Sequence, residues 1–68
     1  MNIKIKFGKR LKEIRNKKKI TQEKLSELAN IDRSYISDIE RGVKSVSLEK
    51  IDQLAKALDI NIVELFKF

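Results

Sequence analysis

Polar side chains between residues 33 and 41 follow a spacing that suits hydrogen bonding to a polar surface. If Ile36 points inward on a helix, a rotation of about 100° per residue places Ile39 about 60° away, on the same side. The polar residues then point outward, roughly 100–200° away: Ser34, Ser37, Asp38 and Arg41. This spacing is typical of a helix that reads base edges in the major groove of DNA. The alternative is an ordinary solvated helix face.

Each outward side chain has a hydrogen-bonding partner on a base edge. Arg33, in the first turn, can donate two hydrogen bonds to guanine O6 and N7. The hydroxyls of Ser34 and Ser37 can donate or accept, and the carboxylate of Asp38 can accept from cytosine N4. We therefore assign base reading to Arg33, Ser34, Ser37 and Asp38. Arg41 and Lys44 flank the far end of this helix, where phosphates would lie. Tyr35 lies on its flank, where two interpretations stay open: it covers the core edge or reaches a phosphate.

A second short helix must position this one. Thr21 is suited to cap it, and Leu25, Leu28 and Ala29 give it an apolar stripe at spacings of three and four. Asn30 stands where a helix ends in a left-handed residue.

The side-chain oxygen of Asp32 can then cap the helix that carries Arg33, with Ile31 and Ile36 as a hydrophobic staple. Gly42 ends that helix. Residues 21–42 therefore predict a helix-turn-helix, whose second helix can enter the major groove.

The same segment resembles a known family. The Thr21-Gln22 opening, the two isoleucines 36 and 39, and the Glu40-Arg41-Gly42 ending resemble the Xre/Cro-type helix-turn-helix family, the DNA-binding domains of lambda-like phage repressors. The string DRSYIS at residues 32–37, followed by Ile39-Glu40-Arg41, is similar to the controller proteins of restriction-modification systems. The resemblance covers residues 7–66.

This resemblance implies a role for particular residues. It implies that Gln22, in the first turn of its helix, contacts the DNA backbone; the positive end of the helix dipole favours a phosphate there. It also places Arg15 and Glu40 together as an ion pair that ties the first helix to the recognition helix. The implied function is sequence-specific transcriptional regulation by a homodimer on a pseudo-palindromic operator of double-stranded DNA, controlling a restriction-modification operon.

The rest of the chain completes an all-α fold. Apolar spacing predicts a first helix over residues 6–18, preceded by a short extended arm that contains Ile3 and Ile5. Ser47 is suited to cap a further helix with one apolar face: Leu48, Ile51, Leu54, Ala55 and Leu58. Asn61 and Glu64 form a capping-box pattern for a last short helix. We expect one domain, residues 1–68, folded as a compact five-helix lambda repressor-like domain in which helices 2 and 3 form the helix-turn-helix.

Composition excludes several kinds of chemistry. The chain has no Cys and no His, which excludes disulfides, thiolate or imidazole metal sites and nucleophile–imidazole pairs. Glu49 and Asp52 lie three residues apart, but acidic residues in a first helical turn are typical of dipole stabilisation. We expect no enzyme, no cofactor, no metal and no small-molecule ligand. No segment approaches the roughly 20 apolar residues that cross a bilayer, which favours a cytoplasmic protein that does not enter the membrane.

Charge is concentrated at one end of the chain. Residues 1–19 hold nine Lys/Arg and one Glu, about +8, whereas residues 20–68 hold seven basic and nine acidic residues, about −2. This asymmetry favours a polyanionic partner that is contacted from the N-terminal side. The alternative is that the first helix only has a solvated basic face.

The C-terminal residues contain more apolar side chains than one short helix can bury against its own core. Such an excess usually marks an association surface, so we expect a homodimer joined through residues 47–68, with Ile62, Val63 and Phe66 at the interface. The alternative is that these three side chains only close the core of the monomer. Two-fold pairing there would place the recognition helices about 34 Å apart, one DNA turn.

Three alternative functions remain open at this point. The chain could be a phage or mobile-element repressor or an antitoxin-like autoregulator, which would keep the DNA-binding mechanism. It could be a protein-interaction module that keeps the fold without reading DNA; the basic first helix and the polar outer face of the recognition helix argue against this. It could also be a detached domain of a larger protein, although Met1 and the capped last helix favour a complete chain.

Overall fold

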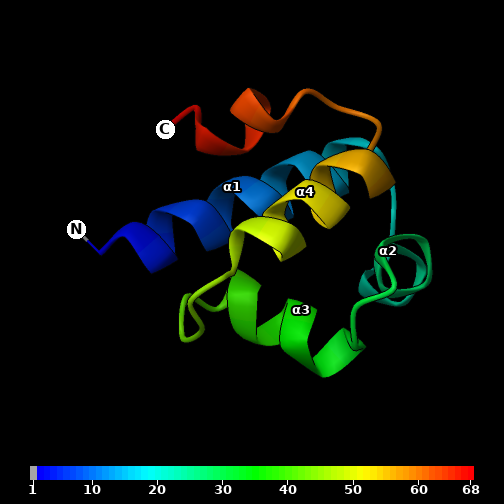
Figure 1. Ribbon diagram of the computed structural model, residues 1–68, viewed down its shortest axis with the longest axis horizontal. Helices are drawn as coiled ribbons and strands as arrows, with labels where there is room; N and C mark the ends of the chain where they lie inside the picture. Colours follow the sequence, from blue (N-terminus) through cyan, green and yellow to red (C-terminus); the bar gives the residue numbers. More distant parts are fainter. Residues whose placement is uncertain (1) are drawn as a thin grey trace.

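The computed structural model describes residues 2–68, and every regular element in that part of the chain is helical. Four α-helices are followed by one 3₁₀ helix: α1 (Ile3–Lys17), α2 (Gln22–Ala29), α3 (Arg33–Glu40), α4 (Leu48–Ala57) and η1 (Ile62–Phe66). The all-α class is as predicted, but the expected fifth helix is a short 3₁₀ segment. Figure 1 shows α1 running through the molecule, with η1 along one side of it and α3 on the other.

The N-terminal arm expected around Ile3 and Ile5 is wrong, because both residues belong to α1. The side-chain oxygen of Asn2 accepts a hydrogen bond from the Lys4 backbone N–H at 2.7 Å, which begins the helix several residues before the predicted start. The alternation of isoleucine and lysine over residues 3–6 suggested an extended strand. Asn2 instead provides a strong local cap for a helix.

The connection between α2 and α3 has the predicted form. The hydroxyl of Thr21 accepts from the Lys24 N–H at 3.0 Å, and Asn30 ends α2 in the left-handed region, at φ 56°. Asp32 occupies the N-cap position of α3, but its side chain makes no capping hydrogen bond. Its carboxylate instead accepts a hydrogen bond from the Ser34 hydroxyl, so that part of the prediction is wrong.

The core draws apolar side chains from every element. Five side chains with almost no exposed surface come from five different helices: Leu11, Leu25, Ile36, Leu54 and Leu65. Two residues assigned to apolar faces are instead exposed: Leu28 at 49% and Leu48 at 80%. Leu48 is the first residue of α4, where the helix has only begun to turn toward the core.

One glycine allows α1 and α3 to pack closely. A Cβ added to Gly8 would lie 2.2 Å from the carbonyl oxygen of Ile39 and 2.9 Å from that of Glu40. Both neighbours are backbone atoms of α3 and cannot rotate away. The absence of a side chain at Gly8 therefore sets the distance between α1 and the end of α3.

Candidate nucleic-acid interface

Helix α3 presents the expected polar face to solvent. Arg33 and Ser34 are exposed, Ser37 and Asp38 are partly exposed, and Ile36 and Ile39 are buried on the opposite side. The structure therefore places all four proposed base-reading residues on one accessible side of a single helix. Two of them also have local partners: Ser34 donates to Asp32, and Asp38 pairs with Arg41 at 3.2 Å.

A buried ion pair joins α3 to α1. The Arg15 guanidinium donates to both Glu40 carboxylate oxygens, from Nε to Oε2 at 2.6 Å and from Nη2 to Oε1 at 3.0 Å. The exposed fractions of the two side chains are 10% and 3%. Arg15 also donates to the carbonyl of Ile20 at 2.8 Å, at the turn that leads into α2. The hydrogen bonds that Arg15 donates to Glu40 raise the pKa of its guanidinium above the ordinary value, although burial opposes this.

Gln22 completes this network from α2. Its side-chain amide donates to the Glu40 carboxylate Oε1 at 3.0 Å. The first three helices thus meet at one carboxylate, with Arg15 from α1, Gln22 from α2 and Glu40 from α3. Gln22 is only partly exposed and keeps its carbonyl oxygen and one amide N–H for other partners.

Tyr35 connects the flank of α3 to the loop that follows it. Its hydroxyl donates to the backbone carbonyl of Ser45 at 3.0 Å, which ties α3 to the loop before α4. The ammonium groups of Lys44 and Lys50 each lie 5.2 Å from the centre of its ring. Both are within the range of a cation–π contact. Tyr35 therefore covers the core edge and holds the loop that carries Lys44. Lys50, which the sequence analysis did not assign to this surface, contacts the same ring.

The basic residues of α1 do not all lie on the side of the helix that faces α3. Arg15 is buried in its ion pair, and three others line a surface hollow with the C-terminal residues Lys67 and Phe68: Lys6, Lys9 and Arg10. Charge counting could not separate these groups, because it carries no information on the direction of a side chain. Gly8 and Arg10 were also missed, since their roles depend on which helices they meet.

Two further observations limit the chemistry of residues 2–68. No three His, Cys, Asp or Glu side chains in this range are grouped so that they could hold a metal ion. No helix in the same range is long and apolar enough to span a membrane. The prediction of no metal site was made from composition, and the arrangement of residues 2–68 offers no candidate metal site.

Comparison with known proteins agrees with this geometry. A helix-turn-helix family model matches residues 11–65. The control protein C.BamHI of Bacillus amyloliquefaciens is 43% identical over 68 residues, which span 98% of this chain and 84% of the relative. The crystal structure of the restriction-modification controller protein C.AhdI from Aeromonas hydrophila has a TM-score of 0.91 at 51% identity, over 93% of this chain and 96% of that one.

A further solved structure contains DNA. The restriction-modification controller protein C.Esp1396I has been crystallised as a tetramer with its natural 35 base-pair operator; it has a TM-score of 0.86 at 34% identity, over 94% of this chain and 84% of that one. The match of family, sequence and fold extends over nearly the whole chain. The chain therefore belongs to the Xre/lambda repressor-like helix-turn-helix family, and it is similar throughout to restriction-modification control proteins.

Proposed function

We propose that this protein is a sequence-specific DNA-binding transcriptional regulator that acts as a homodimer on a pseudo-palindromic operator. Within that class, the similarity to control proteins over almost the whole chain supports control of a restriction-modification operon, including the promoter of its own gene. Regulation by activation or by repression then depends on which operator sites are occupied.

The observation that carries the proposal is the anchoring of α3. Its inner face is buried, its C-terminal end is held by the Arg15–Glu40–Gln22 network, and its outer face stays accessible. A helix fixed in this way meets DNA with little loss of backbone freedom, which favours specific binding. The first turn of α3 then reads bases through Arg33 and Ser34, and the following turn through Ser37 and Asp38.

Residues around this helix supply the contacts to the DNA backbone. We assign phosphate contacts to Gln22 at the start of α2, and to Arg41 and Lys44 at the far end of α3. Tyr35 acts mainly by holding the loop that carries Lys44, and its hydroxyl oxygen can still accept a further hydrogen bond. These contacts position the protein and carry no sequence information by themselves.

A gel-shift titration against DNA from the gene's own promoter and against random DNA tests the proposal at several salt concentrations. If about six to eight phosphates are neutralised per dimer, the slope of log K against log salt should be roughly −5 to −7. Arg41→Ala and Lys44→Ala should each weaken binding to both DNAs. Binding that does not depend on salt, or no binding at all, would favour a protein-interaction module instead.

A further inference from the structure

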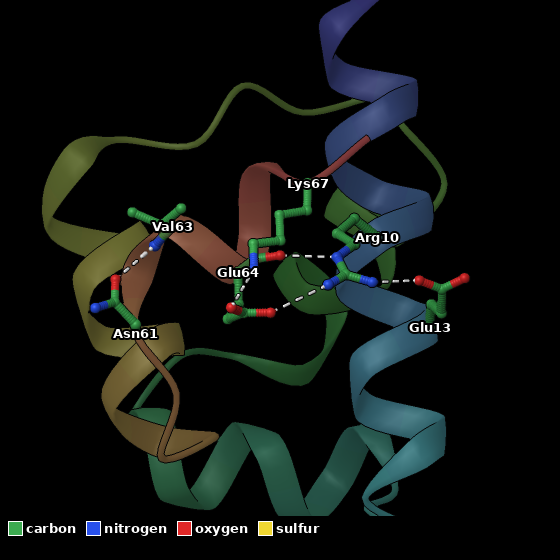
Figure 2. Close-up of polar contacts among 6 residues, drawn as sticks. All are labelled: Arg10, Glu13, Asn61, Val63, Glu64 and Lys67. Carbon is green, nitrogen blue, oxygen red and sulfur yellow. Dashed lines mark hydrogen bonds and ion pairs between the residues drawn. The ribbon is translucent and has the colours of Figure 1, made fainter.

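A single side chain of α1 holds the C-terminal 3₁₀ helix in place. The Arg10 guanidinium donates from Nε to the backbone carbonyl of Glu64 at 2.7 Å, and its Nη2 lies 3.5 Å from the Glu64 carboxylate. Its Nη1 donates to Glu13, one turn further along α1. Figure 2 shows Arg10 between these two partners, with Lys67 on the opposite side of the Glu64 carboxylate. We call the contacts of Arg10 with Glu64 and Glu13 the Arg10 clamp.

The geometry of η1 separates this clamp from the apolar residues. A 3₁₀ helix has three residues per turn, so side chains three positions apart share a face. One face carries Leu65, which is fully buried, and a second carries Glu64 and Lys67, which form the polar contacts. The third face carries Val63 and Phe66, which are 56% and 44% exposed.

Most apolar side chains of this segment are only partly buried. Leu65 is the one η1 side chain that is buried, and the other large apolar side chains of residues 62–68 remain 39–56% exposed. Phe66 lies against Phe7 of α1 with ring centres 5.4 Å apart, at one side of an apolar groove of about 250 Å³. A five-residue helix with so few buried contacts is expected to open easily unless a polar contact ties it down.

The clamp is well placed to supply that contact. The Arg10 side chain is only 16% exposed, and one of its hydrogen bonds is made to a backbone atom of η1. A hydrogen bond from the Lys67 ammonium lowers the pKa of the Glu64 carboxyl, so Glu64 is ionised at neutral pH and attracts the guanidinium.

We infer that Arg10 is a positioning residue for self-association: by fixing η1 on α1, it holds Val63 and Phe66 in the orientation in which a second copy of the chain binds them. The inference rests on the proposed homodimer. It also removes Arg10 from the residues that bind DNA, although it lies in the most basic part of the sequence. Its Nε and both Nη groups are engaged by Glu64 and Glu13.

Arg10→Gln and Lys9→Gln provide a matched pair for the test. Each substitution removes one positive charge from neighbouring positions of α1, but the Lys9 side chain is exposed and outside the clamp. We expect Arg10→Gln to raise the dimer dissociation constant at least tenfold in sedimentation experiments, with an unchanged circular dichroism spectrum. Lys9→Gln should change it less than twofold. Glu64→Gln should have a smaller effect than Arg10→Gln, because the backbone carbonyl of residue 64 remains.

DNA binding distinguishes a specific effect of Arg10→Gln on dimerisation from a general loss of structure. The defect of Arg10→Gln should disappear once the protein concentration exceeds its new dimer dissociation constant, because the dimer itself binds DNA as before. An unchanged dissociation constant would overturn the inference, and so would a DNA-binding defect that persists at saturating protein. If Arg10→Gln does not fold, Arg10→Lys takes its place with an expected increase of at least threefold. A wild-type chain that stays monomeric contradicts the proposed homodimer itself. Failure of the homodimer can therefore be told apart from failure of the role inferred for Arg10.

Discussion

The Arg15 guanidinium is bound by oxygen atoms from two parts of the chain: the Glu40 carboxylate and the Ile20 carbonyl. No buried side-chain N or O atom of residues 2–68 lacks a hydrogen-bond partner, so the charge of this pair is well compensated. Because the pKa of Arg15 is raised in the folded state, its contribution to stability is fully present at neutral pH. On the alkaline side it is lost as the pH rises through the raised pKa. The pair therefore stabilises the DNA-binding half at neutral pH without acting as a pH switch.

Removing one partner of this pair should leave a buried charge without compensation. We expect Arg15→Ala or Glu40→Ala to lower the free energy of unfolding by about 3–5 kcal/mol, and the double variant to lose less than the sum. Urea denaturation of the wild type, the two single variants and the double variant measures the coupling energy between Arg15 and Glu40. The exposed pair Asp52–Lys56, at 3.0 Å, is the control, with an expected coupling of about 0.3–0.5 kcal/mol. Additive losses at Arg15 and Glu40 would show that their contact contributes nothing to stability.

Arg33 is the residue whose substitution separates base reading from phosphate binding. Its side chain is exposed in the first turn of α3 and forms no ion pair within residues 2–68. Arg33→Ala should weaken operator binding by roughly 1–3 kcal/mol and relax the preference at one base position per half-site, with little loss on random DNA. Competition gel shifts measure the affinity for the operator and for random DNA. Arg41→Ala is the control, because it should weaken binding to both. Equal losses on the two DNAs would make Arg33 a phosphate ligand.

At the scale of the helices, local signals predicted most of the fold. Thr21, Ser47 and Asn61 each accept the backbone N–H expected of a cap, and Asn30 takes the left-handed conformation. The errors arose where two local signals competed. Asp32 can hydrogen-bond to a backbone N–H or to the neighbouring Ser34 hydroxyl, and the sequence does not reveal which one it selects.

The last helix shows a similar limit. Glu64 was expected to return to the backbone of Asn61 as part of a capping box, but its carboxylate binds Lys67 and faces Arg10. Arg10 is 54 residues away in sequence. Local spacing cannot reveal such a partner, so the candidate site on α3 was predictable from one segment, whereas the clamp on η1 required the fold.

Gly8 gives a prediction for the packing of α1 against α3. Replacing glycine by alanine inside a helix normally stabilises it by roughly 0.5–1 kcal/mol. Here the new methyl group would meet two backbone oxygens, so Gly8→Ala should instead destabilise the protein, by about 1–3 kcal/mol or more. Thermal unfolding checks the sign, with Asn16→Ala on the exposed side of α1 as the control. A more stable Gly8→Ala variant would show that α1 and α3 separate easily.

At the scale of the whole molecule, the two ends of the domain carry different surfaces. The proposed DNA-binding surface lies on α3, whereas Ile62, Val63 and Phe66 lie on η1, on the other side of α1 (Figure 1). These three side chains are 39–56% exposed, as a surface that is completed by a second copy would be. A two-fold axis through η1 would leave both recognition helices free to face DNA. The proposed homodimer then requires half-site centres about 10 base pairs apart.

Substitution at the centre of this surface tests the homodimer directly. Val63 is 56% exposed, so Val63→Asp should preserve the monomer fold while placing a charge in the apolar interface. We expect sedimentation at micromolar concentration to show a dimer for the wild type and a monomer for Val63→Asp. The control is Leu28→Asp, the same kind of change at a 49% exposed position on α2, which should remain dimeric. Because two half-sites would no longer be bound together, Val63→Asp should lose most of its operator affinity while keeping weak binding to random DNA. A wild-type chain that is monomeric both free and on its operator would contradict the homodimer, and would reduce the role of Ile62, Val63 and Phe66 to covering the core.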